Sequence, residues 1–138
     1  MISKVKHDSA ILSLPSHPKS LLSLESWVNS LCSSHNISVE IYGNILISLS
    51  EAVNNAISHG NHNIVSKKTI VNYSLKKKKI IFSVIDEGKG FNFLDVPDPT
   101  LPENLEKPHG RGIFLMKSLS DGLVYENPGN KVEITFDL

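Results

Sequence analysis

The sequence is poor in features that mark several classes of protein. It has one cysteine, Cys32, so no disulfide can form within the chain, which suits a reducing compartment. No apolar run approaches the roughly 20 residues that a membrane-spanning helix needs. The N-terminal segment has charges among its apolar residues and no small-residue cleavage site, unlike a signal peptide. We therefore expect a cytoplasmic protein without a membrane partner.

An excess of positive charge is also absent. The 14 Lys and Arg residues balance 14 Asp and Glu residues. A nucleic-acid-binding protein needs surplus Lys and Arg to neutralise phosphates, so we expect no direct nucleic-acid partner. The remaining composition, 40% hydrophobic and 20% charged over 138 residues, is typical of one globular domain.

Helical periodicity is clearest in the first half of the chain. Residues 20–33 have apolar positions at helical spacing. A longer helix is expected from an N-cap at Ser38 to about residue 58. We expect Gly60 to end that helix in a left-handed conformation.

Strand patterns flank these helices. A weak one at residues 5–14 ends at Pro15, and β-branched runs at 69–75 and 80–85 surround four lysines that most simply form a solvated turn. Residues 122–138 are expected to form two strands around an Asn-Pro-Gly-Asn turn. These elements predict an α+β fold, a two-layer α/β sandwich with a mixed, mostly antiparallel sheet and helices packed on one face.

The longer helix has an unusual polar side. Asn, Ser and His occupy it in place of the strong helix formers Lys, Glu, Gln and Arg. The residues on that side are Asn44, Ser48, Glu51, Asn54, Asn55, Ser58 and His59. This polar stripe is either the solvent-exposed back of an ordinary surface helix or a functional face.

Glu51 and Asn55 lie at positions i and i+4 of this helix and therefore project side by side. A carboxylate beside a carboxamide can accept a proton and offer an oxygen to a hard cation such as Mg²⁺. His59 and His62 could suggest zinc instead, but zinc would need further ligands and Cys32 is distant.

The sequence DEGKG, residues 86–90, directly follows the strand expected at 80–85. One interpretation is an Asx-type turn that ends the strand. The other places the Asp86 carboxylate against a flat ligand, to which Gly88 and Gly90 allow close backbone approach.

Residues 91–110 contain four prolines and no clear period, which predicts a long irregular connection of the kind often used as a lid. A third helix is expected at 113–119, directly after Gly110, Arg111 and Gly112. Glycines at a helix start expose backbone N–H groups, and the helix dipole favours an anion there. This segment is therefore either a phosphate cradle or a flexible junction.

Taken in order, these elements resemble the nucleotide-binding domain of the GHKL ATPase superfamily. Within it, the chain is similar to the bacterial anti-sigma-factor serine kinases. SEAVNNAISHG carries most of the resemblance, followed by DEGKGF and GRGIFLM. The resemblance covers nearly the whole chain and implies a single histidine-kinase-like ATPase domain over residues 1–138.

The resemblance implies ATP and Mg²⁺ as cofactors. Asn55 would coordinate the Mg²⁺ that bridges the ATP phosphates, and Glu51 would be the general base that deprotonates a substrate serine. Asp86 would hydrogen-bond the adenine amino group, with Gly88 and Gly90 shaping the pocket.

The same resemblance assigns Gly110 and Gly112 to closure of the lid and helix over the phosphates. Anti-sigma-factor kinases usually carry an arginine shortly before this GxG. Here Lys, Pro and His stand there, and the arginine is Arg111, between the glycines. Arg111 is therefore also a candidate for nucleotide binding.

The implied function is that of an ATP-binding anti-sigma factor, a serine/threonine-protein kinase that phosphorylates an anti-sigma-factor antagonist and sequesters a sigma factor, as a homodimer through its N-terminal part. One alternative is a non-catalytic ATP-binding partner-switch module. Glu51 favours the kinase, because a binding module needs no base. A histidine-kinase ATPase fragment is a third reading, but such domains usually have a basic residue where this chain has Ser58.

Overall fold

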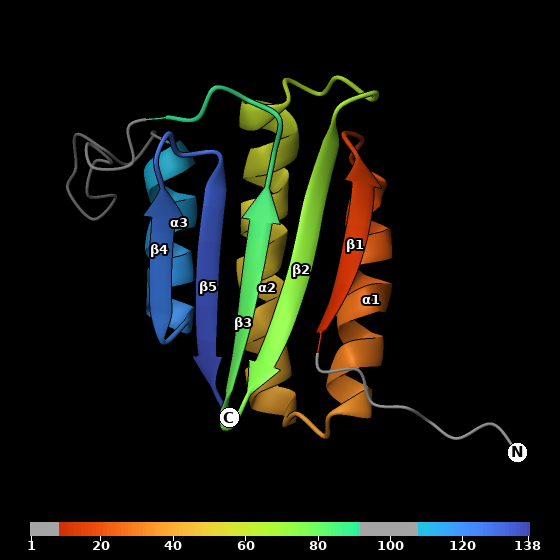
Figure 1. Ribbon diagram of the computed structural model, residues 1–138, viewed down its shortest axis with the longest axis vertical. Coiled ribbons are helices and arrows are strands. Elements are labelled where there is room, and N and C mark those ends of the chain that lie inside the picture. Colours follow the sequence, from red (N-terminus) through yellow and green to blue (C-terminus); the bar gives the residue numbers. More distant parts are fainter. Residues whose placement is uncertain (1–8, 92–107) are drawn as a thin grey trace, which may run out of the picture.

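The computed structural model describes residues 9–91 and 108–138. In this part of the chain, strands form one sheet in the order β1-β2-β3-β5-β4, and each neighbouring pair is antiparallel (Figure 1). The strands are β1 (Ser9–Pro15), β2 (Lys68–Lys76), β3 (Lys79–Ile85), β4 (Gly122–Glu126) and β5 (Lys131–Asp137).

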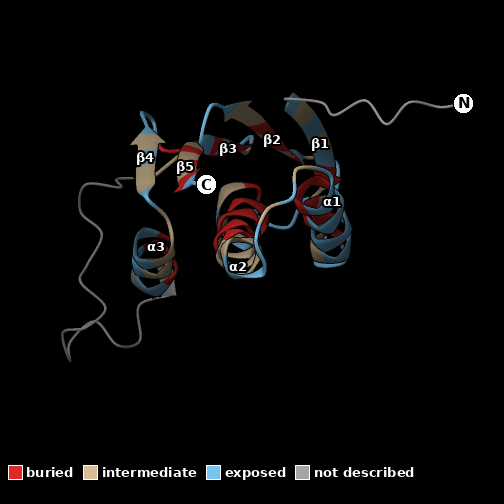
Figure 2. Cartoon of the chain, turned by 90° about the horizontal axis from the view of Figure 1, so that it is seen from below, coloured by how far each residue is buried: buried red, intermediate tan, exposed pale blue. Residues whose placement is uncertain are grey.

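The helices all lie on the same face of the sheet (Figure 2). α2 covers the centre, while α1 lies by β1 and α3 by β4. They are α1 (Ser20–Ser34), α2 (Val39–Asn55) and α3 (Pro108–Leu119), with α2 continued by the π-helical turn η1 (Ala56–Gly60). The expected α+β sandwich with helices on one face is confirmed.

The core lies between the sheet and the helices. Because side chains alternate along a strand, every second residue of the central strands is buried towards the helices. These residues are Thr69, Val71, Tyr73, Ile80, Phe82, Val84, Val132, Ile134 and Phe136. The apolar side of α2 packs on them through Ile45, Leu49, Ala52 and Val53.

The start of α2 agrees with the sequence, but the cause of its end does not. The Ser38 hydroxyl accepts a hydrogen bond from the Ile41 N–H at 3.3 Å, as expected for an N-cap. Gly60 is not left-handed. The helix instead widens into η1, and the positive φ angles come later, at His62 (53°) and Asn63 (58°).

The start of α3 also differs from the expectation. The helix begins at Pro108, so Gly110 and Gly112 lie inside it rather than before it. Proline suits a first helical turn because its fixed φ is helical and the N–H that it lacks would have no partner there. Gly112 is buried, which indicates a packing role for this glycine.

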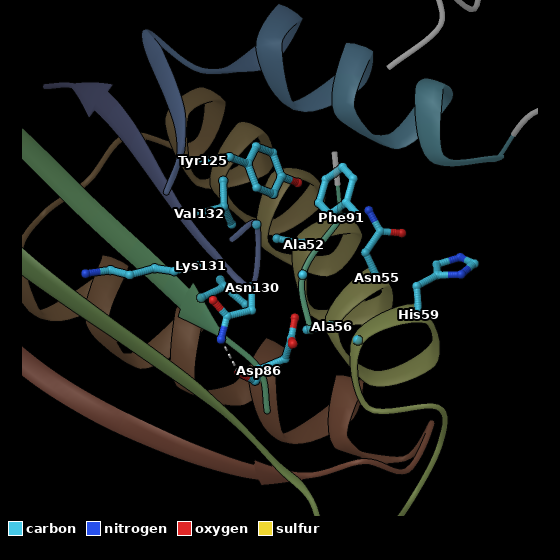
Figure 3. A pocket seen from close by; sticks show the side chains of 14 residues that line it. Ala52, Asn55, Ala56, His59, Asp86, Phe91, Tyr125, Asn130, Lys131 and Val132 are labelled. Carbon is cyan, nitrogen blue, oxygen red and sulfur yellow. Dashed lines mark hydrogen bonds between the residues drawn. The ribbon is translucent and has the colours of Figure 1, made fainter. Parts of the chain in front are cut away.

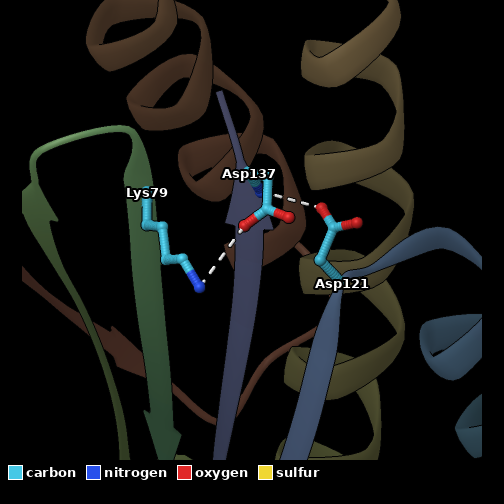
Figure 4. A network of polar contacts seen from close by, with 3 residues as sticks. All are labelled: Lys79, Asp121 and Asp137. Carbon is cyan, nitrogen blue, oxygen red and sulfur yellow. Dashed lines mark hydrogen bonds and ion pairs between the residues drawn. The ribbon is translucent and has the colours of Figure 1, made fainter.

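Where β5 ends, polar contacts join β3, β5 and the turn between α3 and β4 (Figure 4). The Lys79 ammonium lies 3.7 Å from the Asp137 carboxylate, and the Asp137 N–H donates to the Asp121 carboxylate at 2.7 Å. Both members of the ion pair are more than half exposed, so the pair itself contributes at most about 1 kcal/mol. The bond from the Asp137 N–H and the one from the Asp121 N–H to the Thr135 carbonyl (2.8 Å) fix the α3–β4 turn against β5.

Two expectations fall outside the described residues. They are the first part of the strand expected at 5–14 and most of the irregular connection expected at 91–110. Within residues 9–91 and 108–138, no helix combines the length and apolar character that crossing a membrane requires.

Candidate functional site

A cavity opens where β3 ends and β5 begins, against the end of α2 (Figure 3). Its described lining residues come from three separate parts of the chain: Ala52, Asn55, Ala56, His59, Gly60, Val84, Asp86, Gly90, Phe91, Tyr125, Gly129, Asn130, Lys131 and Val132.

Asn130 holds the backbone of Asp86 at the end of β3. The Asp86 N–H donates to the Asn130 carbonyl at 3.0 Å, and the Asp86 carbonyl accepts from the Asn130 side-chain amide at 3.1 Å. The Gly88 N–H donates to the Asp86 carboxylate at 2.7 Å. The carboxylate is thereby fixed on the cavity wall.

The surroundings of Asp86 favour its protonated form. Burial raises the pKa of this carboxyl group above its usual value, and the hydrogen bond from Gly88 opposes the rise. Burial and the nearby charge of Asp86 also raise the pKa of the Tyr125 phenol. Tyr125 and Phe91 meet edge to face, with ring centroids 5.1 Å apart. The cavity therefore combines one carboxylate with an aromatic pair.

Gly60 allows α2 and Asp86 to come together. A Cβ at position 60 would overlap the Asp86 carboxylate. Gly60, the last residue of SEAVNNAISHG, therefore lies directly against Asp86, the first residue of DEGKG. This close approach, rather than a left-handed conformation, explains the glycine at this position.

Asn55 lines the cavity one helical turn after Glu51. Its side-chain nitrogen, Nδ2, is buried and has no hydrogen-bond partner within the described part of the chain. A Cβ at Gly112 would lie 3.0 Å from Glu51 Oε2 and 3.3 Å from Asn55 Nδ2. α3 therefore packs directly over the Glu51–Asn55 pair.

The polar stripe is thus not a uniform solvent-exposed back. Ser48 is fully buried, and its hydroxyl has no partner among the described residues. Asn54 and His59 are exposed, and His59 stands at the edge of the cavity (Figure 3). The part of the stripe that faces α3 and the cavity is the part that carries Glu51 and Asn55.

The structure brings most of the predicted site residues together. Asn55, Asp86 and Gly90 line the cavity, and the Gly88 N–H binds Asp86. Glu51 and Gly112 adjoin Asn55. Of the remaining two, Gly110 lies in α3, and Arg111 is exposed there and is not among the described lining residues.

Four residues around Asp86 were not predicted as site residues from the sequence: Asn61, Phe91, Tyr125 and Asn130. Phe91 directly follows DEGKG and could have been included on that ground. Tyr125 and Asn130 reach the site only through the pairing of β5 with β3 and β4, which no local pattern reveals. Within the described residues, no group of three or more His, Cys, Asp and Glu side chains converges as a metal site.

Comparison with protein families matches residues 14–136 to the histidine kinase-like ATPase domain. An anti-sigma F factor of Thermoanaerobacter sp. (strain X514) is 34% identical over 95 residues, which cover 67% of this chain and 66% of that protein, just under two thirds of its length. A serine-protein kinase RsbW of Oceanobacillus iheyensis is 21% identical over 127 residues, covering 88% of this chain and 80% of the relative.

Among solved structures, the RsbU and RsbW domains of Rv1364c from Mycobacterium tuberculosis match with a TM-score of 0.68 and 17% identity. The match covers 94% of this chain and 31% of that one. At this identity, the likeness establishes the fold alone.

Proposed function

The chain belongs to the histidine kinase-like ATPase domain family, and from this premise we propose that it is a single-domain ATP-dependent protein serine kinase. One observation carries the proposal. The buried, unpartnered amide of Asn55 lies one turn from Glu51, on the wall of the cavity that also holds Asp86. Asn55, which can serve a phosphoryl group and stands next to Glu51 on the helix, thus shares one cavity with a carboxylate that can bind a nucleobase.

Asp86 is proposed to recognise adenine. Its carboxylate accepts a hydrogen bond from the exocyclic amino group, and Phe91 and Tyr125 supply apolar surface for the ring. The desolvation that raises the Asp86 pKa also strengthens a hydrogen bond made there, because the local dielectric constant is low. A nucleotide base fits this chemistry.

Asn55 is proposed to hold Mg²⁺ and the phosphates. Its carboxamide has an oxygen that a hard cation accepts and an Nδ2 donor in need of a partner. When bound, Mg-ATP supplies the phosphoryl group and neutralises the phosphate charge. Gly110 and Gly112 let α3 lie close to this site, and Arg111 is the proposed cation for the outer phosphates.

Glu51 is proposed as the general base. Its carboxylate would accept the proton of a serine hydroxyl as that oxygen forms the new P–O bond and ADP departs as the leaving group. The Gly112 backbone lies beside the Glu51 carboxylate, so a substrate serine does not approach Glu51 through α3.

The names of the relatives suggest the partners. Anti-sigma F factor and serine-protein kinase RsbW both resemble this chain over much of its length. We therefore propose a sigma factor as the sequestered partner and its antagonist as the serine substrate, in the cytoplasm and with the kinase as a homodimer.

One observation favours the non-catalytic alternative. Lys131 is the one Lys or Arg among the described residues that line the cavity, and it is paired with Glu126 at 3.5 Å. Phosphoryl transfer depends on charge neutralisation, so a module that only binds nucleotide would need fewer cations. The two functions differ in their need for Glu51, because the kinase requires a general base and the binding module does not.

The first test compares the melting temperature of the protein with and without Mg-ATP. A ligand at 100 times its dissociation constant stabilises by about 2.7 kcal/mol, so a folded sample without a shift in millimolar Mg-ATP would contradict both functions. The antagonist is then recovered by pull-down with Mg-ADP, incubated with the protein and Mg-ATP, and its phosphoserine is mapped.

Glu51→Gln is the decisive variant, with Glu25→Gln on the exposed side of α1 as its matched control. We expect Glu51→Gln to bind Mg-ADP as the parent does and to lose transfer. Unchanged transfer would remove Glu51 as the base. Absent transfer in the parent, despite binding, would favour the non-catalytic module.

A further inference from the structure

Asn61 is a fully buried polar residue directly after η1. Its side-chain oxygen accepts from the Glu87 N–H at 2.8 Å. Its side-chain nitrogen lies within reach of the Ser16 hydroxyl (2.9 Å), the Lys68 carbonyl (3.1 Å) and the Thr69 hydroxyl (3.3 Å). Every polar atom of the carboxamide therefore has a partner.

The two ends of this carboxamide serve different parts of the molecule. The nitrogen binds the framework, at the end of β1 and the start of β2. The oxygen binds the DEGKG loop one residue after Asp86. On the opposite side, Asn130 holds the backbone N–H and carbonyl of Asp86. Asp86 is thus fixed between two asparagines, of which only Asn130 lines the cavity.

A neutral carboxamide is well suited to this position. The site requires one acceptor and at least one donor in a fully buried place, and a charged side chain would be costly there. The Glu87 carboxylate adds a further link by accepting from the Lys68 N–H. The loop is consequently bound to β2 by side chains as well as to β5 by the backbone.

We propose that Asn61 is a positioning residue that determines base selectivity by holding the Glu87 amide, and through it the direction of the Asp86 carboxylate. This inference rests on the proposed adenine site. Adenine presents an amino donor to a carboxylate, whereas hypoxanthine presents a carbonyl oxygen at the same ring position. A rigid carboxylate repels the oxygen, and a loose one turns away from it.

The experiment compares the dissociation constants of ADP and IDP in the full chain. We expect Asn61→Ala to reduce the ratio of the IDP constant to the ADP constant about tenfold, because the carboxylate is no longer held. Ser16→Ala and Thr69→Val remove partners of the side-chain nitrogen and leave the side-chain oxygen with the Glu87 N–H, although Ser16→Ala also removes the bond from its hydroxyl to the Lys67 carbonyl (2.6 Å). Both controls should lower the melting temperature and keep the parental ratio.

A second readout needs no nucleotide. Glu87 is an exposed residue, so protection of its amide from hydrogen exchange requires the bond to Asn61. We expect this amide to exchange more slowly than that of Lys89 in the parent and in both controls, and to lose its protection in Asn61→Ala.

The outcomes separate the two proposals. A parental ADP/IDP ratio in folded Asn61→Ala, or a Glu87 amide in the parent that exchanges as fast as the Lys89 amide, overturns the role of Asn61. Hydrogen exchange of the Glu87 amide in the parent tests the role of Asn61 even when the Asn61→Ala variant does not fold. A parent that binds ADP and IDP equally contradicts the adenine site, while hydrogen exchange still decides whether Asn61 holds the loop.

Discussion

The Asp86 carboxylate lies against the backbone of Gly60, in the space that a side chain at position 60 would fill. This contact joins the end of the long helix to the loop after β3, two segments that are 26 residues apart in sequence. The cavity depends on it, because Asp86 can face the cavity only where the helix leaves room.

We expect Gly60→Ala to displace Asp86, since overpacking of this kind typically costs about 1–3 kcal/mol. The melting temperature should fall, and ADP binding should weaken. Gly43→Ala is the matched control, because among the described residues no atom beyond the adjoining helix backbone lies within 4 Å of a Cβ at that position of α2. It should stabilise the helix by about 0.5–1 kcal/mol. ADP affinity in Gly60→Ala equal to the parent would contradict the contact.

Gly112→Ala tests the packing of α3 over the Glu51–Asn55 pair. Its Cβ would lie 3.0 Å from Glu51 Oε2 and 3.3 Å from Asn55 Nδ2, tight enough to move both side chains. Alanine also favours the helix by up to about 1 kcal/mol, so the melting temperature should change little. We expect the Mg²⁺-dependent part of ADP affinity to fall, measured by titration with and without Mg²⁺. A variant that retains this dependence would remove Gly112 from the site.

Asp86→Asn should increase stability near neutral pH and weaken ADP binding. The pKa of Asp86 is raised in the folded state from an ordinary value of 3.8, mainly by burial. The folded protein therefore holds this proton to higher pH than the unfolded chain. The contribution of Asp86 to stability is full below the unfolded pKa and is lost as the pH rises through the folded one.

The measurement is the melting temperature of Asp86→Asn minus that of the parent, followed from acidic to neutral pH. We expect this difference to grow across the window above 3.8 and then to level off. ADP affinity should fall about 10- to 100-fold, since a hydrogen bond to a charged group contributes about 1.5–3 kcal/mol. A difference that stays constant with pH would show that burial does not act on this carboxylate.

Cys32 should report unfolding. It is buried in α1, and burial raises its thiol pKa to about 11. At pH 8 only on the order of one thiol in a thousand is then ionised, and the thiolate is the reactive form. We expect iodoacetamide to label the native protein slowly and the urea-unfolded protein quickly. Rapid labelling under native conditions would contradict the packing of α1 on the sheet.

Elements with a local signal could be predicted from the sequence. The strands β2 and β3 were evident from their β-branched runs, and the Ser38 cap and the turn between β4 and β5 were evident as well. The helical segment ends at Gly60 as expected, but the π-helical geometry of that end and the start of α3 could not be predicted from glycine alone. Gly60 and Gly112 leave room for Asp86 and for the Glu51–Asn55 pair, respectively, and neither neighbour is local in sequence.

The same distinction applies to the site. Asn55 and Asp86 stand in compact motifs, and the structure places both on one cavity. Asn61 carries no such mark, because an asparagine after a helix end is an ordinary loop residue until β1, β2 and the DEGKG loop surround it. Residues that act through backbone contacts with distant segments are the ones that sequence patterns miss.

The position of β5 has a consequence for folding. This strand is near the C-terminal end of the chain, yet it lies between β3 and β4 and completes the cavity wall beside Asp86. During synthesis, one edge of β3 therefore stays unpaired until β5 has left the ribosome. An unpaired strand edge is prone to aggregation. Nucleotide has no complete cavity to bind before that step, so we expect it to slow unfolding and to leave the rate of folding unchanged.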